Sequence, residues 1–132
     1  MIQYTEGYKY QLHADAVIPL PDAFKGQAFT AEWGKLKDCA LTLYKGYAWD
    51  GASGPTHDDK SNMVGALGHD GLYQAMREGF MKRDMKDAAD DFLRDRCIED
   101  GMNRVRAWLW HRAVKKFGLN ATLRNRDILV AP

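Results

Sequence analysis

Three glycines divide the second half of this 132-residue chain into segments of helix length. Gly79, Gly101 and Gly118 each follow a stretch in which apolar residues recur at helical spacing, and glycine is a common residue just past a helix C-terminus. Side chains able to cap a helix precede two of these stretches: Ser61 or Asn62, and Asn103. The sequence therefore predicts helices at about 61–78, 83–100 and 103–117. The link between the first two is short, so they must run antiparallel.

The first half has the patterns of a β-sheet instead. Apolar and polar residues alternate over Tyr8–Leu12, and two further segments, Phe29–Trp33 and Leu41–Tyr44, are rich in aromatic and branched residues. Pro19 and Pro21 are expected to break the chain between them. We therefore predict an α+β fold, in which a β-rich N-terminal half packs on three C-terminal helices.

One domain over residues 1–132 is the simplest organisation, because the chain has ordinary domain length and shows no repeat or linker. Within it, 1–60 would hold strands and loops, 61–118 the helices, and 119–132 a tail. The apolar end of that tail, Ile128–Val130, can add an edge strand.

Charge is unevenly distributed although the net charge is only +1. Residues 61–102 carry nine acidic and six basic side chains, whereas residues 103–132 carry seven basic and one acidic. A chain with a net charge near zero, whose aromatic residues are mostly expected to pack in the core, does not favour nucleic acid as a partner. The basic third helix, with Trp110 off its core stripe, can instead contact a phospholipid surface or another protein. The alternative is a packed terminal helix whose basic face is only solvated. On that helix we expect an apolar stripe that faces the core, formed by Val105, Trp108, Leu109 and Phe117. Trp110 is expected to lie off this stripe.

The two cysteines, Cys39 and Cys97, are too few for a disulfide framework and are expected to be free thiols. The first residues, MIQYTEGYKY, lack the apolar run of a signal peptide. No stretch approaches the roughly 18 apolar residues of a membrane span. A cytoplasmic protein is therefore expected, unless the chain is assembled into a particle.

Polar side chains with catalytic potential gather around the first two helices. His69 and Asp70 are adjacent and so point about 100° apart, whereas Tyr73 lies on nearly the same face as His69. The adjacent pair Asp90 and Asp91 falls in the middle of the antiparallel second helix, within reach of His69. Asp50 stands in the small-residue loop before the first helix, where backbone carbonyls can approach an ion.

This arrangement fits a hydrolytic site. A histidine whose ring is held by a carboxylate can act as a general base on water. Asp70 and Asp50, on the loop side, can hold a hard cation such as Ca²⁺. The other interpretation is structural, because a buried histidine paired with an aspartate is often only a satisfied core contact. The second helix also carries a run of acidic residues mixed with basic ones, and the outer members of that run are expected to form a solvated face: Asp84, Asp87, Asp90, Asp91 and Asp95, with Lys82, Arg83, Lys86, Arg94 and Arg96. Spacing leaves open whether Asp90 or Asp91 faces His69.

Three motifs occur in order between about residues 41 and 118: the loop DGAS-x-P at 50–55, the helix motif HD-x-LY at 69–73, and the pair Ala89–Asp90. In this the chain resembles a family of short uncharacterised phage and prophage proteins. The resemblance implies a phage gene product, located in the host cytoplasm or in the virion, with other phage proteins among its partners.

The same residues also resemble small bacterial phospholipase A2 enzymes, in a shorter match. That resemblance implies His69 as general base, Asp90 as the carboxylate that orients it and Tyr73 as the tyrosine of the same helix. It implies Asp50 and Asp70 as Ca²⁺ ligands. The chain departs from those enzymes because Ala52 replaces the loop cysteine, no signal peptide is evident and the first half is β-rich.

Two functions follow as hypotheses. One is a phage-encoded, calcium-dependent lipid ester hydrolase of the phospholipase A2 type. The other is a non-enzymatic phage component, in the virion or in host interaction, in which the DGAS and HD motifs are structural.

Overall fold

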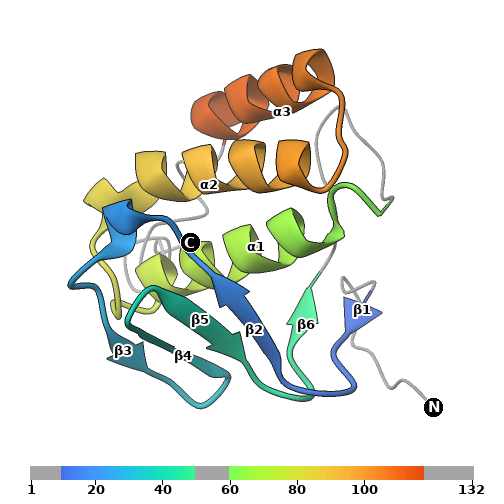
Figure 1. The fold of residues 1–132 in the computed structure, drawn as a ribbon. Coiled ribbons are helices and arrows are strands. Elements are labelled where there is room, and N and C mark those ends of the chain that lie inside the picture. Colours follow the sequence, from blue (N-terminus) through green and yellow to red (C-terminus); the bar gives the residue numbers. More distant parts are fainter. Residues whose placement is uncertain (1–9, 50–59, 118–132) are drawn as a thin grey trace, which may run out of the picture.

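The computed structural model describes residues 10–49 and 60–117, with strands in the first range and helices in the second. Figure 1 shows the strands on one side of the molecule and the helices stacked away from them in the order α1, α2, α3. The α+β prediction is confirmed. The tail 119–132 and the loop 50–59 lie outside the described residues. No helix in the described ranges is long and apolar enough to cross a membrane.

Four antiparallel strands form the main sheet, in the order β2-β5-β4-β3. Their bounds are β2 Ala16–Pro19, β3 Phe29–Thr30, β4 Gly34–Lys37 and β5 Ala40–Leu43. A separate two-stranded sheet pairs β1, Tyr10–Gln11, with β6, Ala48–Trp49. A short 3-10 turn, η1 (Asp22–Phe24), follows β2 and buries Phe24.

Register places a row of apolar side chains across one face of the main sheet. Phe29 pairs with Leu36, Leu36 with Leu41, and Leu41 with Ile18, and all four side chains are buried. They pack against α1 in one core that includes Leu72. Because strand side chains alternate between the two faces, the lysines of β4 point to solvent.

The strand predictions were right in kind but incomplete. Leu41–Tyr44 overlaps β5, whereas Phe29–Trp33 contains only the two residues of β3 and then turns into β4. Pro19 was expected to break the chain, but it is the last residue of β2 and pairs with Ala40. This is tolerated because β2 is an edge strand, where proline's missing N–H costs no ladder bond.

The turn between β4 and β5 explains why two strands follow so closely here. Asp38 and Cys39 both have positive φ, 52° and 58°, and they form a two-residue hairpin turn. Turns of this kind match the twist of antiparallel strands.

Three helices follow, as predicted: α1 Met63–Arg77, α2 Lys86–Glu99 and α3 Arg104–Phe117, with a 3-10 turn, η2 (Arg83–Met85), leading into α2. Gly79 and Gly101 take positive φ just past α1 and α2, as their positions suggested. The Asn103 side chain caps α3, since its Oδ1 accepts from the N–H groups of Val105 and Arg106.

A second, smaller core lies between the helices. It joins Ala66 of α1 and Leu93 of α2 with Ala107 and Trp110 of α3. Cys97 is buried in it, and both cysteines are free thiols as predicted. This core is separate from the one between the sheet and α1.

The predicted inward stripe of α3 was wrong. Val105, Trp108 and Leu109 are exposed, whereas Trp110 is buried. The helix carries two apolar stripes at helical spacing, and periodicity alone does not choose between them. The inner stripe centres on Ala107, whose small side chain fits into the core against α2. The Phe117 side chain lies outside what the structure describes.

Small residues on α1 allow α2 to approach closely. A Cβ built on Gly65 would lie 2.8 Å from the Cys97 sulfur, and one on Gly68 would lie 2.8 Å from the Phe92 ring. Such distances leave no room for a side chain. The close approach brings the polar residues of α1, including His69, against the middle of α2.

Replacing Gly68 by alanine tests this packing. Alanine favours a helix by about 1 kcal/mol over glycine. Its methyl group would, however, meet the buried Phe92 ring, and overpacking of this kind costs about 1–3 kcal/mol. We expect Gly68→Ala to lower the free energy of unfolding measured in urea. The same Gly68→Ala change made in a Phe92→Leu background should cost less free energy of unfolding than it does in the wild type, because the ring that the methyl group meets is gone. Equal losses in both backgrounds would contradict the packing argument.

Candidate functional site

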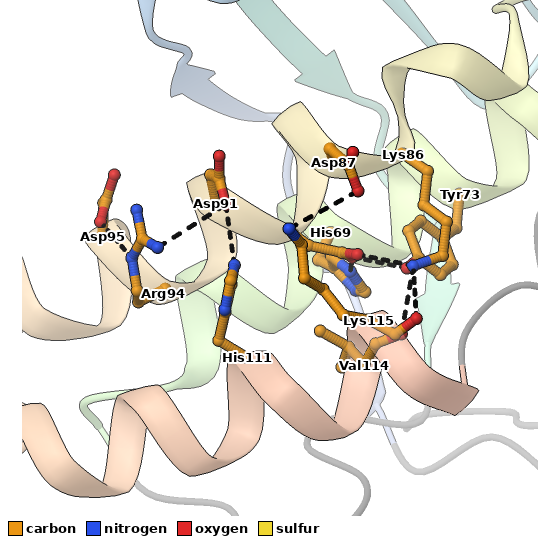
Figure 2. Close-up of polar contacts among 11 residues, drawn as sticks. His69, Tyr73, Lys86, Asp87, Asp91, Arg94, Asp95, His111, Val114 and Lys115 are labelled. Atoms are coloured by element: carbon orange, nitrogen blue, oxygen red, sulfur yellow. Dashed lines mark hydrogen bonds and ion pairs between the residues drawn. The ribbon is translucent and has the colours of Figure 1, made fainter.

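Asp90 is the centre of the site. It lies in the middle of α2 with no exposed surface, and three side chains donate to its carboxylate. His69 Nε2 lies 2.8 Å and Tyr73 Oη lies 2.5 Å from Oδ1, while Lys86 Nζ lies 2.7 Å from Oδ2. Figure 2 shows the side chains of His69 and Tyr73, from α1, close to that of Lys86, from α2. Both carboxylate oxygens are therefore satisfied.

Helix periodicity produces this convergence. His69 and Tyr73 are four residues apart on α1, so their rings lie one turn apart on the same face, with centroids 4.1 Å apart. Lys86 and Asp90 have the same spacing on α2. Where the two faces meet, two donors from one helix and one from the other reach a single acceptor.

The electrostatics of the site fix the protonation of each group. Burial lowers the pKa of His69 and outweighs the attraction of Asp90, while the Lys86 charge lowers it further. Burial would raise the pKa of Asp90, but the hydrogen bonds from His69, Lys86 and Tyr73 together lower it. The pKa of Tyr73 is raised, chiefly by burial and by its bond to Asp90. These directions favour an ionised Asp90, a neutral His69 imidazole and a neutral Tyr73 phenol at neutral pH.

The tautomer of His69 follows from these states. The ionised carboxylate can only accept, so Nε2 must carry the proton and donate it to Asp90. Nδ1 is then the ring nitrogen with a lone pair. This is the arrangement of a histidine able to take a proton from water.

Lys86 was not predicted as a site residue, since in the sequence it is one of several basic residues mixed with the aspartates of α2. It is buried, and its ammonium group also donates to the carbonyls of Val114 and Lys115, each at 3.3 Å. These are carbonyls of the last turn of α3, where the helix dipole favours a cation. The spacing of four residues from Asp90 was the signal available in the sequence.

Asp91 forms a second pair, on the other side of α2. Its Oδ1 lies 2.7 Å from Nε2 of His111 on α3, and 3.6 Å from Nη1 of Arg94 (Figure 2). The His111 side chain is largely buried, but the Asp91 side chain is 47% exposed. Adjacent aspartates therefore tie α2 to different helices, Asp90 to α1 and Asp91 to α3.

The structure brings some of the predicted site residues together and leaves others apart or outside the described residues. His69, Tyr73 and Asp90 are brought together, and of the adjacent pair it is Asp90, not Asp91, that contacts His69. Asp70 is partly buried on α1, where its charge adds to the rise in the pKa of Tyr73. Asp50 lies outside the described residues. Within 10–49 and 60–117, no group of three or more His, Cys, Asp or Glu side chains is placed to hold a metal ion.

Comparison of the chain with models of known protein families, with curated proteins and with solved structures finds no match. The likeness to a phage family and to phospholipase A2 therefore rests on the sequence motifs, and any function must be argued from the site itself.

The adjacent aspartates provide a matched pair of variants. Asp90→Asn would leave the Lys86 ammonium buried without its counter-charge, and breaking a buried pair in this way costs about 3–5 kcal/mol. Asp91→Asn affects a half-exposed pair, for which we expect a loss of about 0–1 kcal/mol. Urea unfolding of both variants measures the difference. Similar losses would contradict the central place of Asp90.

The lowered pKa of His69 predicts a pH dependence of stability. In the unfolded chain this histidine titrates near its ordinary value of 6.5, whereas the folded chain binds the proton only at lower pH. As the pH falls below 6.5, the free energy of unfolding should therefore decrease, by up to about 1.4 kcal/mol per pH unit, until the folded pKa is reached.

Urea unfolding of wild type and His69→Gln at a series of pH values isolates this contribution. The variant should lose the part of the slope that His69 supplies. His13→Gln, which changes an exposed histidine, should keep the wild-type slope. An unchanged slope in His69→Gln would show that burial does not depress this pKa.

Proposed function

We propose that this protein is a phage-encoded hydrolase of the phospholipase A2 type, in which His69 is the general base and Asp90 orients it. The observation that carries the proposal is the bond from His69 Nε2 to a buried carboxylate that Tyr73 also holds in place. This bond fixes the ring and leaves Nδ1 free of a proton. The low pKa keeps the imidazole neutral, and thus competent as a base, at physiological pH.

In the proposed reaction, Nδ1 of His69 takes a proton from a water molecule as the water oxygen adds to the carbonyl carbon of an ester. The resulting imidazolium is stabilised by the Asp90 carboxylate, and it then gives its proton to the departing alkoxide as the ester C–O bond breaks. The products are a carboxylic acid and an alcohol. The positive charge of Lys86 disfavours the imidazolium form of His69 and lowers its pKa. His69 is therefore a weaker base than a histidine that is bound to an aspartate with no cation nearby.

Calcium enters the proposal through Asp50 and Asp70, the two residues that the resemblance to phospholipase A2 suggests. A bound Ca²⁺ would stabilise the negative charge that develops on the ester oxygen. The proton transfers assigned to His69 and Asp90 do not depend on the ion.

A second candidate function is that of a non-enzymatic phage component, in the virion or in host interaction. The observation that favours it is the bridging position of Lys86, which joins Asp90 to the carbonyls at the end of α3. In this case the site exists to fix three helices against one another, as buried polar networks can do.

Hydrolysis of a fluorogenic, short-chain phospholipid kept below its micelle concentration separates the two functions. For a hydrolase, His69→Asn should lower kcat by about 10²–10⁴-fold, the usual contribution of a general base. His13→Asn is the matched control and should retain activity, and circular dichroism should confirm that both variants are folded. Wild-type activity in His69→Asn would contradict the role of the histidine. Absence of activity in the wild type, with and without Ca²⁺, would favour the non-enzymatic function.

Calorimetric titration with Ca²⁺ tests the metal separately in the same proteins. We expect binding by the wild type that weakens in Asp70→Asn. If neither protein binds the ion, the calcium part of the proposal fails while the assignment of His69 still stands or falls by the activity assay.

A further inference from the structure

The outward side of α3 is apolar where a surface helix is normally polar. Val105 is 65% exposed, and Trp108 and Leu109 are each 49% exposed, which are high values for side chains of this kind. Figure 1 shows α3 as the outermost helix, packed on α2. The helix has therefore used its other stripe for the core and presents this one to its surroundings.

These side chains form one continuous face. Residues three and four apart on a helix lie on the same side, which places Trp108 and Leu109 next to Val105. Ala107 and Trp110, which pack into the core, lie on the opposite side. We call Val105, Trp108 and Leu109, with Arg104 and Arg112 beside them, the outer face of α3.

Positive charge surrounds the apolar centre of this face. The helix contains five Lys and Arg residues and no Asp or Glu: Arg104, Arg106, Arg112, Lys115 and Lys116. The Arg112 guanidinium lies 5.0 Å from the centre of the Trp108 ring. In the shallow groove between α2 and α3, Arg104 lies beside Arg94 and Asp95, whose charges already pair with each other at 2.8 Å.

Two of these cations stand where they destabilise α3. Arg104 and Arg106 stand in the first turn of α3, which has no acidic residue, and the helix dipole disfavours cations at that end. Residues that violate a local stability rule often serve a function. An anionic surface would convert this unfavourable arrangement into an attractive one.

We propose that the outer face of α3 docks on an anionic phospholipid surface, with Trp108 and Leu109 entering the interface and the arginines contacting lipid phosphates. A tryptophan and aliphatic side chains flanked by Arg and Lys are suited to the boundary between headgroups and acyl chains. A second copy of the chain fits less well, because a symmetric contact would place the basic α3 helices against each other. The proposal is independent of the hydrolytic function.

Sedimentation with vesicles tests the proposal on the full-length protein. Wild type should bind vesicles of phosphatidylcholine mixed with phosphatidylserine, bind pure phosphatidylcholine far more weakly, and be released by high salt. Trp108→Ala/Leu109→Ala should lower the partition coefficient by about tenfold or more, because two apolar side chains are lost from the interface. Arg104→Ala and Arg112→Ala should each lower it by about fivefold, the equivalent of roughly 1 kcal/mol per basic residue.

Matched controls use the same residue types elsewhere on the surface. Phe80→Ala removes an aromatic side chain that is 42% exposed, and Lys35→Ala removes an exposed cation from β4. Neither should change vesicle binding. Equal binding to both kinds of vesicle, or no effect of Trp108→Ala/Leu109→Ala, would overturn the proposal. A dimer in analytical ultracentrifugation that this double variant dissociates, without vesicle binding, would assign the outer face of α3 to a second copy instead.

Discussion

The arrangement of the three helices depends on a buried carboxylate, that of Asp90, which has no solvent-exposed surface. Removing the Asp90 charge from solvent is costly, and it is tolerated only because three donors surround it. His69 and Tyr73 come from α1, and Lys86 comes from α2 itself. Since Lys86 also reaches the last carbonyls of α3, the relative positions of all three helices are linked to one buried charge.

The two candidate functions use the same contacts for different ends. The bond that would orient His69 as a base also ties α1 to α2, so a catalytic and a structural role are distinguished by turnover and not by geometry. The outer face of α3 is a separate feature, on the side of the helix opposite its core contacts. It would serve a lipid hydrolase by bringing the protein to a membrane, and it would serve a non-enzymatic phage protein equally well.

Much of the fold was predictable because its signals are local. Gly79, Gly101 and Asn103 mark helix ends through backbone conformation and capping, and these effects depend on neighbouring residues only. The contact between His69 and Asp90 was also within reach, since two antiparallel helices joined by a short link must bring their middles together. The catalytic and calcium-binding roles stay predictions.

The features that sequence could not give depend on choices between equivalent surfaces. Lys86 lies in a run of mixed charges, and its buried contacts include carbonyls of α3, a helix whose position the local sequence does not specify. The two apolar stripes of α3 satisfy the same periodicity, and the core selects the one centred on the small Ala107. Strand β2 was hidden by Pro19, whose place at a sheet edge is decided by the order of the strands.

The two neighbouring aspartates of α2 also determine its angular setting. Successive residues on a helix differ by about 100° and 1.5 Å, so Asp90 and Asp91 address two different sides of α2 at nearly the same height. If α2 moved by one residue along its axis, it would also rotate by about 100°, and neither carboxylate would face its present partner. Asp90 would lose the hydrogen bonds from His69 and Tyr73 of α1, and Lys86 would lose the carbonyls at the end of α3. Asp90 and Asp91 together therefore favour one rotation of α2 about its axis, the one in which Asp90 contacts α1 and Asp91 contacts α3.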